Sequence, residues 1–156
     1  MLEQLNLLTE QETITEIVRV KQVVMERPVA YAEGMTSTER AGRLGMNEIG
    51  DEAQEVVLIL ILNTKNQINA IHRVFTGSLN TSVAHPREIF RSAILNNGAR
   101  IILYHNHPSS DLTPSEADLN FTRRMKEAAN VLGIELLDHF IVSDTKWLSF
   151  KEIGLL

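Results

Sequence analysis

The chain has no cysteine among its 156 residues. This absence excludes disulfide bonds and metal sites that depend on thiolate ligands. It also argues against the zinc deaminases, which hold their metal in part through cysteine. A chain without cysteine suits a reducing compartment, where disulfides are rare. Any metal bound here must therefore be held without thiolate ligands.

Long hydrophobic runs are also missing. The longest one, Val56–Leu62, has seven residues, whereas a helix that spans a bilayer needs about 20. The N-terminus lacks the basic start and apolar core of a secretory signal. We therefore expect a cytoplasmic protein that does not enter a membrane.

Positive charge is scarce as well. The 15 lysines and arginines are outnumbered by 20 acidic residues, which gives a net charge of −5 and a pI near 5.5. A surface that binds duplex DNA normally carries a concentrated basic patch. The nearest candidate, Arg123 and Arg124 with Lys126, is better interpreted as the solvated face of a helix. Direct DNA binding by this chain is therefore not expected.

The remaining composition is that of a globular protein. Hydrophobic residues make up 44% and charged residues 22%, and a chain of this length can bury a core of its own. No repeat or linker divides the sequence. We predict a polar N-terminal arm over residues 1–13 and one domain over residues 14–156.

Hydrophobic periodicity predicts strands interspersed with helices. The predicted strands cover residues 14–24, 56–62, 67–76, 100–104, 134–142 and 147–150, and the predicted helices cover residues 36–48, 86–97 and 114–132. The run at 56–62 is apolar on both faces, which is typical of a central strand covered on both sides. The predicted fold class is α/β, or α+β in three layers, with a mixed central sheet flanked by helices.

The chemically most informative segment is YHNHPSSDLTPSEAD, residues 104–118. His105 and His107 lie at the end of a predicted buried strand, and side chains two residues apart on a strand point to the same side. Pro108 then ends the strand. Such a pair of histidines often does no more than satisfy loop carbonyls, so by itself it is weak evidence for a metal.

A predicted helix start follows the histidines. Thr113 is placed to cap the helix, Pro114 fits the first helical position, and Glu116 completes a capping box. Ser115 and Asp118 are three residues apart and share one helix face. A carboxylate is thereby placed where it can meet the two histidines.

His105, His107 and Asp118 together supply three ligands. A catalytic zinc keeps this number when its fourth position is left for water. Nitrogen and oxygen ligands suit one zinc ion per chain, although the spacing alone leaves iron, cobalt and manganese open.

The chain resembles a known family at this motif. The order His105-Asn106-His107-Pro108, then Ser115 and Asp118, resembles the JAMM motif of the JAB/MPN metallopeptidase-like domains. More narrowly, the chain resembles the RadC family through GSLN at 77–80, HPREIF at 85–90, the segment 105–118, LGI at 132–134 and DH at 138–139. This resemblance extends from about residue 14 to the C-terminus. It implies the JAB/MPN fold, which is like the cytidine deaminase fold in outline.

Two features qualify the resemblance. Asn106 stands where the peptidase branch usually has serine or threonine, and asparagine there is similar to RadC. Full-length RadC proteins also carry a helix-hairpin-helix region before this domain. The sequence leaves no room for it, so we expect the catalytic-type domain alone.

The resemblance also implies roles for further residues. The family's general base is a glutamate at the entry to the first central strand, a position matched best by Glu55, with Glu52 as the alternative. Ser115 matches a serine that hydrogen-bonds the developing oxyanion, and its alternative role is that of a helix cap. His139, which follows Asp138, is interpreted as a core histidine in preference to one that orients a ligand.

Two functions follow. The first is a zinc-dependent hydrolase acting on a peptide or isopeptide bond of a peptide or protein substrate. The second is a non-hydrolytic accessory or interaction module that acts in DNA repair or nucleic-acid processing and reaches nucleic acid through a complex, since the RadC family is associated by name with DNA repair. No position of the motif is missing, which favours the hydrolase.

A homodimer that pairs an exposed edge near residues 17–24 is a further hypothesis.

Overall fold

The computed structural model describes residues 13–28, 34–77, 79 and 85–156. Within these ranges the elements are, in chain order, α2 (Thr38–Ile49), β1 (Val56–Leu62), β2 (Ile68–Thr76), α3 (Pro86–Leu95), β3 (Arg100–Asn106), α4 (Glu116–Leu132), β4 (Glu135–Val142) and β5 (Trp147–Ser149). The strands form one sheet in the order β2-β1-β3-β4-β5. Strands β3 and β4 are parallel and the other neighbours are antiparallel, so the predicted mixed sheet is confirmed.

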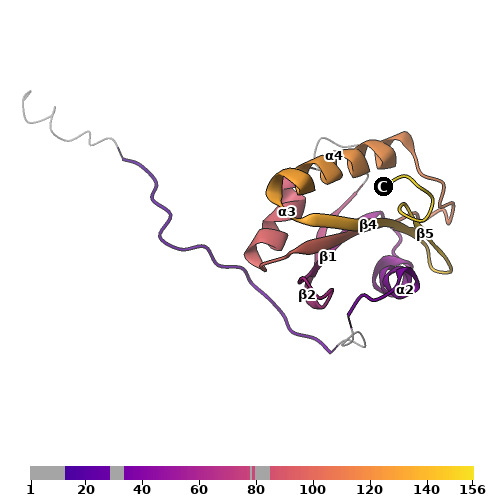
Figure 1. The fold of residues 1–156 in the computed structure, drawn as a ribbon, viewed down its shortest axis with the longest axis horizontal. Coiled ribbons are helices and arrows are strands. Elements are labelled where there is room, and N and C mark those ends of the chain that lie inside the picture. Colours follow the sequence, from indigo (N-terminus) through magenta and orange to yellow (C-terminus); the bar gives the residue numbers. More distant parts are fainter. Residues whose placement is uncertain (1–12, 29–33, 78, 80–84) are drawn as a thin grey trace, which may run out of the picture.

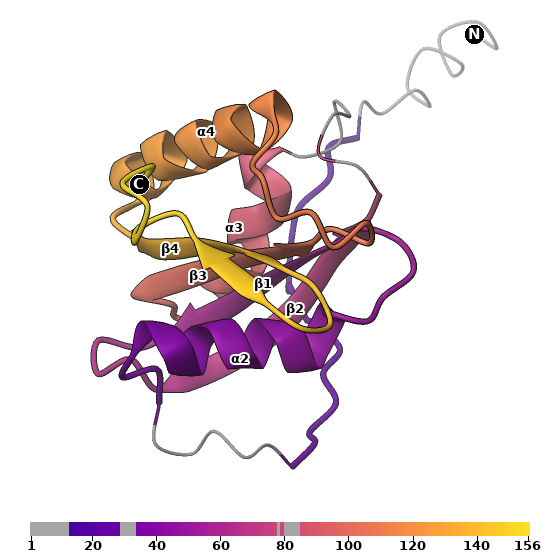
Figure 2. The same ribbon diagram turned by 90° about the vertical axis from the view of Figure 1, so that its right-hand side faces the viewer.

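The sheet is the middle of three layers. Helices α3 and α4 cover one face and α2 covers the other (Figures 1 and 2). Every residue of β1 is buried, as predicted for a central strand. Its side chains alternate, so that Ile59 and Ile61 pack beneath α3 and α4, whereas Leu58 and Leu60 pack against α2. The same alternation on β3 decides which of its side chains face α4.

Two glycines let α2 lie close to the sheet. A Cβ added to Gly42 would come within 2.4 Å of the Trp147 ring, and one added to Gly45 would come equally close to the Tyr104 ring. Tyr104 is itself stacked on Phe140, with ring centroids 5.3 Å apart. A larger residue at either glycine would push the helix away from these rings.

The predicted strand at residues 14–24 is wrong. Residues 13–28 form neither helix nor strand, and Figure 1 shows them running away from the sheet. The segment contacts the rest of the chain through Gln22, whose amide is paired with that of Asn96, and through an ion pair between Arg27 and Glu48. β-branched residues favour a strand only where a neighbour takes up the backbone hydrogen bonds, and no described strand of this chain does so.

The predicted N-terminal arm and the predicted homodimer are not tested by this structure. Apart from Thr13, the predicted arm at residues 1–13 lies outside the described residues. Pairing of residues 17–24 with a second copy stays a prediction. Among the helices that the structure describes, none combines the length and apolar character needed to cross a bilayer.

Candidate metal centre

Strand β3 brings two histidines to the sheet face that α4 covers. Leu103 packs beneath α4, so His105, two residues later, lies on that face too. His107 follows just beyond the strand. Its backbone N–H donates to the carbonyl of Val142 on β4 at 3.0 Å, which extends the strand pairing by one residue and keeps the second imidazole beside the first.

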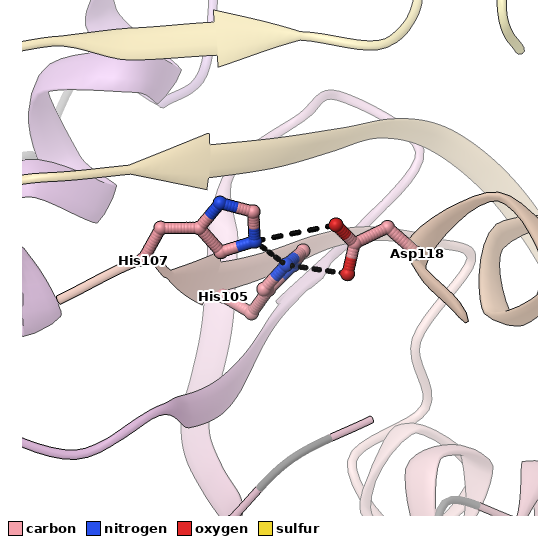
Figure 3. Close-up of side chains that lie close together, drawn as sticks. All are labelled: His105, His107 and Asp118. Carbon is pink, nitrogen blue, oxygen red and sulfur yellow. Dashed lines mark hydrogen bonds and ion pairs between the residues drawn. The ribbon is translucent and has the colours of Figure 1, made fainter. Parts of the chain in front are cut away.

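Asp118 reaches the two imidazoles from the first turn of α4 (Figure 3). The Nε2 atom of His105 lies 3.0 Å from Oδ1 of Asp118, and Nε2 of His107 lies 3.2 Å from Oδ2. The two Nε2 atoms are 2.9 Å apart. His105 and Asp118 are buried and His107 is partly exposed. Three ligand atoms this close together and this sheltered can hold a metal ion.

The other ring nitrogens are engaged away from this centre. Nδ1 of His107 lies 2.7 Å from the main-chain carbonyl of Asp111. A carbonyl only accepts, so Nδ1 carries the hydrogen and a neutral His107 turns an unprotonated Nε2 toward Asp118. Nδ1 of His105 is likewise 2.8 Å from Nε2 of His139. The neutral His107 therefore turns an acceptor toward a carboxylate, an arrangement that needs a cation, either a metal ion or a proton.

The cap of α4 fixes the carboxylate. The backbone N–H of Ser115 donates to Oδ2 of Asp118 at 2.8 Å, and the N–H of Asp118 donates to the Ser115 hydroxyl at 3.1 Å. The N-cap is therefore Ser115, and the helix begins at Glu116. The predicted cap at Thr113 and helix start at Pro114 are wrong, because Asp118, and not Glu116, takes the acidic position of the capping box.

His107 and Asp118 favour each other's charged form. Burial alone raises the pKa of Asp118, but the nearby imidazoles of His105 and His107 and the hydrogen bond from the Ser115 N–H outweigh it and hold that pKa well below its usual range. The hydrogen bond to Asp118 raises the pKa of His107 against the opposing effect of burial. The raised pKa favours a proton on His107, and this proton would supply the positive charge beside Asp118 in the metal-free protein.

The raised pKa of His107 predicts that the stability of the metal-free protein depends on pH. A raised folded pKa means that the contribution of His107 is complete below the unfolded value of about 6.5 and is lost as pH rises through the folded value. Urea unfolding of chelator-treated wild type and His107→Gln, at pH about 6 and about 8.5, measures that contribution as the difference in unfolding free energy. The difference should shrink toward the higher pH. Growth of the difference would contradict the ion pair with Asp118.

Asn106, between the two histidines, faces the opposite side of the sheet. Its side-chain oxygen accepts from the backbone N–H of Val56 at 2.7 Å, and its amide nitrogen donates to the carbonyls of Glu52 at 3.2 Å and Gln54 at 3.0 Å. Asn106 is buried. These three bonds hold the chain on either side of Glu55 against the end of β3, which ties the candidate base to the histidine strand.

A pocket of about 300 Å³ opens beside the three ligands. Glu55, Ser115, His107 and Asp118 all contribute to its wall. The alternative base, Glu52, instead pairs with Arg73 of β2. The structure thus places Glu55, not Glu52, in the pocket wall.

His139 is fully buried and lies directly against the centre. Its ring is in contact with His105 and, through Nδ1, with the hydroxyl of Thr122 at 2.6 Å. Burial lowers the pKa of His139 well below its usual value. The interpretation of His139 as a core residue was therefore incomplete, because it is both buried and bonded to a candidate ligand.

Comparison with known proteins agrees with this architecture. A mixed sheet covered on both faces, with two histidines ending an inner strand and an aspartate on the next helix, defines a JAB/MPN-like domain. The family model described as "RadC-like JAB domain" matches residues 35–155. The chain belongs to this family.

Curated relatives are similar over the same region. A UPF0758 protein of Clostridium beijerinckii is 52% identical over 122 residues, covering 78% of this chain and 53% of the relative. A UPF0758 protein of Clostridium botulinum is 56% identical over 101 residues, covering 65% of this chain and 44% of the relative. The chain therefore spans about half the length of the curated relatives it matches.

Proposed function

We propose that the chain is a zinc-dependent metallohydrolase, a JAMM-type peptidase or isopeptidase. The observation that carries the proposal is the convergence of His105, His107 and Asp118 while the Nδ1 atoms of both rings are engaged elsewhere. Membership of the RadC-like JAB family supports it. In a cluster that only stabilised the core, each acceptor would be expected to face a donor, whereas these three side chains bring their acceptor atoms together.

One zinc ion per chain would be held by His105, His107 and Asp118, whose nitrogen and oxygen atoms suit it. Such an ion polarises a carbonyl group and lowers the pKa of bound water toward about 7. Outer contacts orient all three ligands: the Asp111 carbonyl for His107, the Ser115 N–H for Asp118, and His139 for His105. This degree of support is typical of ligands at metal sites.

Glu55 is proposed as the general base. It lies in the wall of the pocket that contains His107 and Asp118, and Asn106 holds the backbone on both sides of it. Its carboxylate would take the proton of the attacking water and pass it to the leaving nitrogen. Glu52 is unsuited to this role because its carboxylate pairs with Arg73.

Ser115 is proposed to stabilise the developing oxyanion. Its oxygen accepts from the Asp118 N–H as a helix cap, and a hydroxyl that accepts still has a hydrogen to donate. The side chain is exposed and lines the pocket. The cap and the oxyanion role are therefore compatible.

At about 300 Å³, the pocket is at the small end of ligand sites and suits a short extended stretch of peptide.

The test combines metal content with a hydrolysis assay. Protein purified without chelator should contain about one zinc per chain by mass spectrometry, as expected of a site with three protein ligands and a fourth position open to water. The zinc-loaded protein should cleave members of a peptide or isopeptide library. Failure to contain or take up zinc would refute the hydrolase. Zinc binding without cleavage of any substrate would favour the accessory module instead, to be pursued through its partners.

A further inference from the structure

A continuous chain of hydrogen bonds leads from the main chain of α4 to the candidate ligand His105. The hydroxyl of Thr122 donates to the carbonyl of Asp118 at 2.8 Å. The same oxygen lies 2.6 Å from Nδ1 of His139, and Nε2 of His139 lies 2.8 Å from Nδ1 of His105. The side chains of Thr122, His139 and His105, which form this series of hydrogen bonds, are all buried, so water does not compete for these bonds.

The direction of each bond follows from the carbonyl at its start. A carbonyl oxygen has no hydrogen, so the single hydroxyl hydrogen of Thr122 must point to Asp118. The Thr122 oxygen can then only accept from His139, which places a hydrogen on Nδ1 of that ring. Complete burial favours a neutral ring, so Nε2 of His139 is an acceptor. Nδ1 of His105 must therefore donate, which leaves Nε2 of His105 unprotonated.

We propose that Thr122 and His139 are positioning residues that set the tautomer of His105. Through them, the Asp118 backbone carbonyl keeps the Nε2 lone pair of His105 directed at the Asp118 carboxylate and available to a metal. The expected effect of this tautomer on metal affinity rests on the proposed function. The tautomer itself is a property of the metal-free protein.

The surroundings hold His139 in the required orientation. Its ring packs against Phe121, with ring centroids 5.7 Å apart, and against Phe150, with ring centroids 4.6 Å apart. Its backbone N–H donates to the Asp138 carboxylate at 2.7 Å, and its carbonyl accepts from the Phe150 N–H at 2.9 Å. A ring fixed at this many points can transmit a hydrogen-bond direction without changing position.

The first test compares Thr122→Val with Thr122→Ser. Valine keeps the shape and removes the hydroxyl, whereas serine restores it. Long-range ¹H–¹⁵N correlation spectra of chelator-treated protein report the tautomer of His105. Wild type and Thr122→Ser should show hydrogen on Nδ1, and Thr122→Val should show loss or mixing of that tautomer. Zinc affinity, measured by competition with a chromophoric chelator, should fall roughly 10–100-fold in Thr122→Val only.

A second pair keeps the inference testable if Thr122→Val does not fold. His139→Gln can place a carbonyl oxygen near the Nε2 position and still accept from His105, whereas His139→Leu cannot. Zinc affinity should stay within a few-fold of wild type for glutamine and fall roughly 10–100-fold for leucine.

The outcomes separate this inference from the proposed function. A folded Thr122→Val with the wild-type tautomer and affinity would overturn the inference, as would equal losses in His139→Gln and His139→Leu. If wild type binds no zinc, the proposed function fails, and the spectra of the metal-free variants still decide whether Thr122 and His139 set the tautomer.

Discussion

Asp118→Asn is expected to abolish high-affinity zinc binding while the protein stays folded. Removal of an outer contact to a metal ligand typically costs about 10–100-fold in affinity, so replacing a ligand itself should cost at least about 100-fold. Asparagine keeps an oxygen that can accept from the Ser115 N–H, so the cap of α4 is retained. Chelator competition measures the affinity, and circular dichroism checks the fold.

Glu116→Gln is the matched control for Asp118→Asn. Glu116 is exposed in the same first turn of α4 and carries the same charge, but it is not part of the three-ligand group. Its substitution should leave zinc affinity within about twofold of wild type, because exposed charges interact weakly. Similar losses in both variants would mean that the general charge of the helix start, not a ligand, governs metal binding.

Glu55→Gln is expected to lower the hydrolysis rate by about 10²–10⁴-fold, the usual contribution of a general base. Zinc content should not change, because Glu55 lies in the pocket wall outside the three-ligand group. Initial rates on a cleaved library peptide, together with metal analysis, measure the two effects separately. A loss of zinc together with activity would show that Glu55 acts on the metal site and not as a base.

Glu52→Gln tests the alternative general base that the sequence left open. It removes the same charge three residues earlier, from a side chain that pairs with Arg73. An exposed ion pair contributes little to stability, so the hydrolysis rate should remain close to that of wild type. A larger loss in Glu52→Gln than in Glu55→Gln would reverse the assignment of the base.

Much of the fold follows from local patterns in the sequence. The uninterrupted apolar run of β1 predicts a strand buried on both faces, and the structure confirms it. Gly133 ends α4 with a left-handed cap, as its place after a helical pattern predicts. The two-residue spacing of His105 and His107 predicts one shared face, because alternation is a property of the strand itself.

The wrong predictions concern segments whose conformation depends on distant partners. Residues 14–24 have the composition of a strand, but a strand exists only where another strand pairs with it. The start of α4 was predicted from Thr113 and Pro114, which are reasonable helix-start residues. Tertiary contacts favour Ser115 as the cap, because the Asp118 carboxylate bonds the Ser115 N–H while facing both histidines.

The supporting residues of the centre were missed for a related reason. Asn106 stood out in the sequence only as a departure from the peptidase motif, yet it bonds three backbone groups about 50 positions away in the chain. Thr122 lies one helical turn after Asp118, a spacing that suggests a shared face, but nothing in the sequence joins it to His139. Hydrogen bonds between separate elements leave no periodic pattern to detect.

The sequence by itself determined the identity and spacing of the three candidate ligands, the strand and helix that carry them, and the family. These features depend on residues that are close together in the chain. Only the tertiary structure decided that Glu55 lines the pocket, that Glu52 pairs with Arg73, and that His139 contacts His105. These contacts join separate elements of the fold, and their geometry is set by how the sheet and helices pack, not by any local preference.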